Sequence, residues 1–155
     1  MTVTRAFGVA LCGIALSACA TGTTQTMSSD QAIAARQQLM KEQGAAMRSI
    51  SDKLKGGQVQ AVASDAEKLV QTSRKIPSLF PAGSVSPQTS RAKPEIWQKR
   101  AEFEGHAKTL ETKATQLVAT AQGGNAQTTQ AAVADINRTT CTACHDAFRG
   151  PEIKK

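Results

Sequence analysis

Apolar residues recur at helical spacing in four segments of this chain, and two glycine pairs separate the segments into two sets of neighbours. In the first segment, apolar residues fall at every seventh position, which places them on one face of a helix. These residues are Ile33, Met40, Met47 and Leu54. The same reasoning predicts helices over residues 29–55, 59–75, 94–122 and 127–149.

The connections between these segments indicate how the helices are arranged. Gly56–Gly57 and Gly123–Gly124 are short turns, which make the helices on either side antiparallel neighbours. Residues 77–94 are rich in proline and serine, so we expect a long loop there. The chain is therefore predicted to be all-α, with one up-down-up-down antiparallel four-helix bundle over residues 29–150 and a short tail over 151–155.

The sequence Cys141-Thr142-Ala143-Cys144-His145 lies in the last predicted helix. Two cysteines at this spacing, followed directly by histidine, are typical of a c-type haem attachment site. On a helix the three side chains share one face, so both thiols can add to the haem vinyl groups while the imidazole reaches the iron. We predict one covalently attached haem c near the C-terminus.

Three other interpretations of this motif remain to be compared with the structure. A structural zinc site needs four cysteine or histidine ligands, and the further candidates are only Cys12, Cys19 and His106. A thioredoxin-like motif needs strands, and no segment has a strand pattern. A disulfide between Cys141 and Cys144 would leave His145 without a role.

The N-terminus predicts export from the cytoplasm. Residues 1–18 have Arg5 followed by a short apolar stretch, as in a signal peptide. Leu16-Ser17-Ala18-Cys19 resembles a bacterial lipobox, so we expect a lipid on Cys19 and attachment to the periplasmic face of the outer membrane. Ordinary cleavage after Ala20 is the alternative. Residues 19–28 are polar and are expected to form a flexible tether.

Charge and composition narrow the choice of partners. The chain carries a formal net charge of +7, but its lysine and arginine residues are spread along the sequence. No basic block with interleaved aromatic residues indicates nucleic-acid binding. We expect a solvated basic surface that favours an acidic redox partner or an anionic membrane. Nothing in the sequence indicates a substrate-converting enzyme.

Five segments together resemble the class II cytochromes c, the family of cytochrome c prime and its low-spin relatives. The resemblance covers most of the chain between Asp30 and Arg149 and implies a four-helix bundle with haem near its C-terminus. The matching segments are Arg36–Met40, Leu79–Ser84, Ala92–Trp97, Phe103 and Cys141–Arg149.

The resemblance also implies roles for individual residues. Cys141 and Cys144 would form the thioethers and His145 would be the proximal iron ligand. Arg149 would lie on the proximal side of the haem, and Arg36 would lie near a haem propionate. Without the resemblance, both arginines are more simply interpreted as solvated cations on a helix face.

The role of Met40 distinguishes between two expected functions. In the low-spin branch of the family a methionine at this position is the sixth iron ligand, and the protein carries single electrons. In the cytochrome c prime branch the residue only packs over the iron, and the protein binds nitric oxide or carbon monoxide.

We favour His145/Met40 ligation and electron transfer to a periplasmic redox partner, with gas binding as the alternative. A third reading is a haem-bearing interaction or stress lipoprotein. Met47 is expected in the core and His106 on the surface. The sequence leaves both a monomer and a homodimer open.

Overall fold

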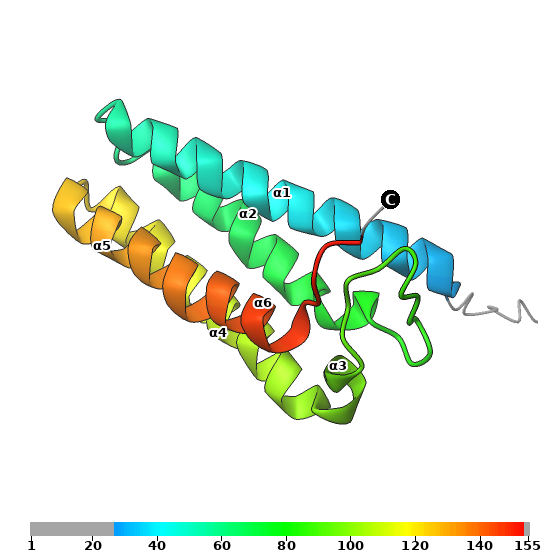
Figure 1. Ribbon diagram of the computed structural model, residues 1–155. Helices are drawn as coiled ribbons and strands as arrows, with labels where there is room; N and C mark the ends of the chain where they lie inside the picture. Colours follow the sequence, from blue (N-terminus) through cyan, green and yellow to red (C-terminus); the bar gives the residue numbers. More distant parts are fainter. Residues whose placement is uncertain (1–26, 154–155) are drawn as a thin grey trace, which may run out of the picture.

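The computed structural model describes residues 27–153, and these residues form an antiparallel four-helix bundle (Figure 1). Helix α1 packs on α2, α2 packs on α4, and α4 packs on α5. The predicted fold class is therefore confirmed. The long helices are α1 (Ser29–Lys55), α2 (Val62–Lys75), α4 (Arg100–Gln122) and α5 (Ala126–Ile136).

The signal peptide, Cys19 and most of the predicted tether lie outside the described residues, as does the end of the tail. Within residues 27–153, no helix is both long enough and apolar enough to cross a membrane.

Local sequence explains where α1 and α2 begin and end. Ser28 caps α1, because its hydroxyl accepts a hydrogen bond from the Gln31 backbone while the Gln31 side chain bonds back to the Ser28 N–H. The N-cap residue is therefore Ser28, just before the predicted start of the helix at Ser29 or Asp30. Gly57 closes the first turn with a φ of 73°, a conformation that favours glycine. Helix α2 begins at Val62 rather than at the predicted residue 59, since residues 58–61 continue the turn.

The predicted third helix is broken into two parts. A short helix, α3 (Glu95–Gln98), is separated from α4 by Lys99, whose φ of −113° and ψ of 47° are not helical. Arg100, directly after the break, donates hydrogen bonds to the carbonyls of Pro77 and Phe80, each at 2.8 Å. The break therefore brings the start of α4 onto the preceding loop. The sequence did not predict it, because residue 99 is neither glycine nor proline.

The predicted last helix contains a wider turn. Helix α5 passes into a π-helical segment, Asn137–Thr142, before α6 (Ala143–Phe148) completes it. The hydroxyl groups of Thr139 and Thr140 donate to carbonyls four residues earlier, those of Asp135 and Ile136. Such side-chain bonds compete with the regular helix ladder. A π-turn shifts the face presented by every residue that follows, so it sets the direction of the haem motif.

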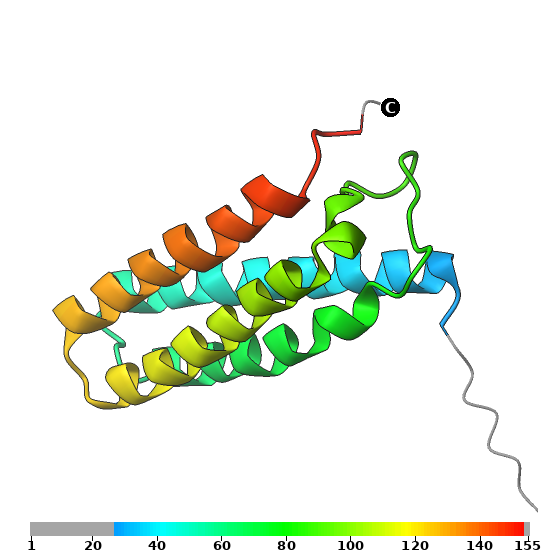
Figure 2. The ribbon, with the colours of Figure 1, turned by 90° about the horizontal axis from the view of Figure 1, so that it is seen from below.

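Helices α2 and α4 run side by side and form the most extensive helix–helix contact among the described residues (Figure 2). These two helices carry small buried residues, with Ala66 and Ala114 fully buried, as are Leu69 and Leu117. Alanine permits close approach of two helix backbones but contributes little apolar area. Three aromatic rings extend the core towards one end. The ring centroids of Phe80 and Phe103 are 4.8 Å apart, and those of Phe103 and Phe148 are 5.5 Å apart.

Asp65 ties α1 to α2 near the glycine turn. Its carboxylate is 2% exposed and accepts hydrogen bonds from Ser49, Lys53 and Lys68. Burial alone would raise the pKa of Asp65, but these three donors outweigh burial and hold it at about 2. The ionised carboxylate is therefore part of the folded structure.

We expect Asp65→Asn to lower the free energy of unfolding by about 2 kcal/mol at neutral pH. Because the folded-state pKa lies below the ordinary value of 3.8, this stability is complete above 3.8 and is lost as the pH falls towards about 2. Urea unfolding at pH 7 and at pH 2.5 measures both values. Asp52→Asn is the matched control, since Asp52 is exposed and its pair with Lys55 spans 3.9 Å. Equal stabilities of wild type and D65N at pH 7 would contradict this account.

Candidate haem site

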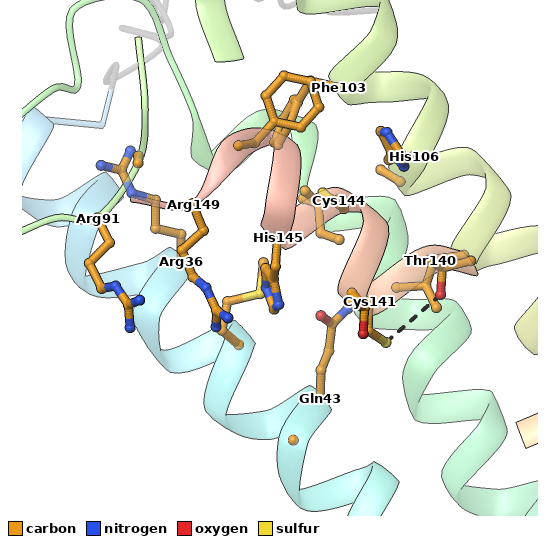
Figure 3. A pocket seen from close by; sticks show the side chains of 18 of the residues that line it. Arg36, Gln43, Arg91, Phe103, His106, Thr140, Cys141, Cys144, His145 and Arg149 are labelled. Carbon is orange, nitrogen blue, oxygen red and sulfur yellow. Dashed lines mark hydrogen bonds between the residues drawn. The ribbon is translucent and has the colours of Figure 1, made fainter. Parts of the chain in front are cut away.

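A cavity of about 660 Å³ lies between α1 and the C-terminal arm, which consists of the π-helical segment and α6. It is at the end of the bundle that carries the aromatic rings. This volume is within the range of about 300–1,000 Å³ that is usual for cofactor pockets. Figure 3 shows the side chains of 18 of the residues that line it. The lining residues from the C-terminal arm include Thr140, Cys141, Cys144, His145 and Phe148, and those from α1 include Arg36, Met40, Gln43, Gly44 and Met47.

Both cysteines and His145 border this cavity (Figure 3). Cys141 lies in the π-helical segment, whereas Cys144 and His145 lie in α6, so the motif spans the junction between the two helix types. Both thiols are free, which does not support the disulfide interpretation. The pKa of the Cys144 thiol is raised to about 11, mainly because the thiol is buried and to a smaller extent because Cys141 lies nearby.

His145 is held in its neutral form by its surroundings. Burial lowers its pKa first, and the guanidinium groups of Arg149 and Arg91 lower it further, while Asp146 opposes them. Neutral imidazole is the form that binds a metal ion. Within the part of the chain that the structure describes, no cluster of three histidine, cysteine or acidic side chains converges to hold a metal ion. The zinc interpretation therefore has no support here.

Arg36 is buried at the cavity wall, with 3% of its surface exposed. Its guanidinium donates to the Ser84 hydroxyl at 3.0 Å, the Ser84 carbonyl at 2.8 Å and the Ser90 hydroxyl at 2.7 Å. It also lies over the Phe80 ring, 4.7 Å from the centroid. Burial lowers the pKa of this group. The interpretation of Arg36 as a solvated surface cation is therefore wrong.

The acceptors around Arg36 are all uncharged. Among the described residues, no carboxylate lies within ion-pair distance of its guanidinium. A buried cation without an anion is costly, because hydrogen bonds to neutral oxygens replace only part of its hydration. The site would therefore gain stability from a negatively charged group in the cavity.

A backbone contact between two distant segments, which the sequence did not indicate, forms part of the cavity wall. The backbone N–H of Gly150 donates to the Arg91 carbonyl at 2.7 Å, and that of Lys93 donates to the Phe148 carbonyl at 3.0 Å. This bridge places the exposed Arg149 and the half-buried Arg91 at the cavity. Ser90 and Arg91 carry no spacing or motif that would have revealed their position.

His106 lies differently from what was expected, and Met47 borders the cavity as well as the core. His106 is half-buried, lines the cavity and packs edge-on against Phe148, with 5.7 Å between ring centroids, so the surface prediction is wrong. Met47 packs against the core as predicted but also lines the cavity. Gln43 was not predicted as a site residue. It lines the cavity and donates from Nε2 to Thr72 Oγ1 at 3.1 Å.

The α1 wall of the cavity leaves room for a flat group. Met40, Gly44 and Met47 follow at helical spacing and share one face of α1. A Cβ atom at Gly44 would meet only the Arg48 guanidinium, at 3.4 Å, so the protein itself does not require glycine there. The missing side chain enlarges the cavity. Free thiols, a neutral imidazole, apolar walls and an unpaired cation together fit a covalently attached haem with its carboxylates.

Comparison with known proteins points to one family. The family described as Cytochrome C′ matches residues 31–149. A cytochrome c′ from Rhodopseudomonas palustris is 31% identical over 133 residues, which cover 83% of this chain and 88% of that protein. A second relative, the cytochrome c′ from Alcaligenes xylosoxydans, is 34% identical over 74 residues, which cover 46% of this chain and 58% of that protein.

Solved structures agree with this result. The crystal structure of cytochrome c′ from Thermochromatium tepidum has a TM-score of 0.73 and 27% identity, and the match covers 81% of this chain and 99% of that one. The nitric oxide complex of a cytochrome c′ variant from Alcaligenes xylosoxidans has a TM-score of 0.70 and 25% identity, covering 80% of this chain and 98% of that one.

We expect the double variant Cys141→Ala/Cys144→Ala to lose covalent haem completely, because no other cysteine of the described residues borders the cavity. Denaturing electrophoresis followed by a haem peroxidase stain measures this. Cys12→Ala is the control and should keep the stained band. A stained band in the double variant would contradict the assignment of the attachment site.

Proposed function

Because the chain belongs to the cytochrome c′ family, we propose that it binds a small diatomic gas, nitric oxide or carbon monoxide, at a five-coordinate haem iron. Members of this family carry one covalently attached haem c, and so does this chain. The observation that carries the proposal is the similarity to a cytochrome c′ whose structure was solved as its nitric oxide complex.

The C-terminal arm supplies the groups that hold the cofactor. Cys141 and Cys144 form the two thioethers, and His145 is the protein ligand to iron from the α6 side of the cavity. Bound haem supplies an iron atom that can take a diatomic ligand or an electron. The opposite side of the cavity is the α1 wall, so an external ligand binds on the side of Met40 and Gly44.

Met40 decides between the two functions considered from the sequence. Its side chain is half-buried, packs against the core and lines the cavity. In the gas-binding function it is a packing residue of the α1 wall, whereas as sixth ligand it would make the protein a low-spin electron carrier. The position of its thioether in the same cavity as His145 keeps the electron carrier as a second candidate.

The arginines at the site are assigned to the haem periphery. Arg36 neutralises a haem propionate, an assignment supported by its burial and by the absence of a carboxylate partner among the described residues. Arg149 lies on the His145 side of the cofactor, which agrees with its influence on the pKa of His145.

We expect the ferric wild type to be high-spin at neutral pH and the ferrous protein to bind carbon monoxide. Met40→Ala should leave the spin state unchanged, because the thioether is not an iron ligand. Absorption spectra of both oxidation states measure this. A low-spin ferric spectrum with a sulfur-to-iron charge-transfer band, lost in Met40→Ala together with a fall in reduction potential, would instead establish the electron carrier.

Arg36→Gln should lower the reduction potential of the holoprotein, because a nearby positive charge stabilises the iron after it has gained an electron. Arg36→Lys keeps the charge and should stay close to wild type. Arg74→Gln is the control, since Arg74 pairs with Glu111 outside the cavity, at 2.8 Å. Redox titration monitored by absorbance gives the four potentials. Equal potentials for Arg36→Gln and wild type would refute the propionate assignment.

The cellular setting of the proposed function follows from the N-terminal sequence. We assign the protein to the periplasm, attached to the outer membrane by a lipid on Cys19. Mass spectrometry of the mature N-terminus tests this, and an unmodified terminus at Thr21 would make the protein freely soluble. A related cytochrome c′ is described as undergoing ligand-controlled dimer dissociation, so a homodimer is the oligomer to test first.

A further inference from the structure

A second hollow of the molecule adjoins the haem cavity. It is a groove of about 700 Å³ between α1 and α5, and its walls are formed mainly by exposed or half-buried residues. From α1 they include Arg48, Ser51, Asp52, Leu54 and Lys55, and from α5 they include Gln130, Val133 and Ala134. The groove is therefore accessible to solvent along its length.

Two residues, Met47 and Asn137, line both the groove and the haem cavity. They lie on opposite sides, since Met47 belongs to α1 and Asn137 is the first residue of the π-helical segment. Met47 is half-buried and Asn137 is exposed. These two side chains therefore lie where the groove and the cavity meet.

The groove meets the cavity on the side where an external ligand must bind. Met47 shares the α1 face with Met40 and Gly44, whereas His145 occupies the α6 side. A small molecule that passes between Met47 and Asn137 therefore arrives at the α1 wall. Methionine has an unbranched side chain with three rotatable bonds, so it can move aside without displacement of the helix.

We propose that the α1–α5 groove is the access route for the diatomic ligand and that Met47, together with Asn137, is its gate. This inference rests on the proposed gas-binding function and adds the residues that control ligand access. A gate changes the barrier between solvent and cavity but not the free energy of the bound state. Its variants must therefore change the association and dissociation rates by the same factor and leave the affinity unchanged.

The test is flash photolysis of the ferrous carbon monoxide complex, with stopped-flow replacement of the ligand for the dissociation rate. Met47→Ala and Asn137→Ala should raise both rates, and Asn137→Trp should lower both, by about tenfold for a barrier change near 1.4 kcal/mol. Because Asn137 is exposed, its two variants do not disturb the core. Leu54→Ala is the control, since Leu54 lines the groove but not the cavity.

Three outcomes would overturn the gate alone, and a fourth would overturn the gas-binding function with it. Unchanged rates in all variants of Met47 and Asn137 would show that the ligand takes another path. Rates that slow only in Lys41→Trp would place that path beside the exposed Lys41, which lines the cavity but not the groove. A changed affinity with only one rate altered would mean that Met47 acts on the bound ligand itself. A wild type that takes up no carbon monoxide overturns the gas-binding function as well, which distinguishes the two failures.

Discussion

A four-helix bundle that holds a cofactor must keep two of its helices apart over part of their length, and here α1 and α6 are the separated pair. Two buried polar groups hold α1 in this position. Near the glycine turn, Asp65 accepts hydrogen bonds from Ser49 and Lys53 of α1. Towards the other end, Arg36 of α1 binds the loop that carries Ser84 and Ser90. The middle of α1, between these two anchors, forms one wall of the cavity.

The opposite wall depends on the π-helical segment and on the bridge between residues 91–93 and 148–150. The wide turn between Asn137 and Thr142 sets the direction of the motif cysteines, and the backbone bonds from Gly150 to Arg91 and from Lys93 to Phe148 fix the end of α6. His145 is consequently held by backbone geometry on both sides. This rigidity suits an iron ligand, whereas the α1 wall of flexible methionines and a glycine suits a ligand that comes and goes.

The uneven distribution of charge around the cavity supports this division. Arg36, Arg91 and Arg149 gather on one side of the cavity (Figure 3). Arg149 and Arg91 lower the pKa of His145, whereas Arg36 has no carboxylate partner among the described residues. The interior beyond them is lined mainly by apolar side chains such as Leu69 and Phe103. A flat apolar cofactor with carboxylates on one edge matches this arrangement.

The sequence by itself determined the helical segments, the glycine turns and the haem motif, because each depends on residues close together in the chain. Apolar spacing needs only one helix, and Cys141, Cys144 and His145 need only one turn. The break at Lys99, the half-buried position of His106 and the burial of Arg36 depended on the tertiary structure. Each results from contacts between segments far apart, such as Arg36 with Ser84 and Ser90, and no local spacing encodes the partner of a side chain across the bundle.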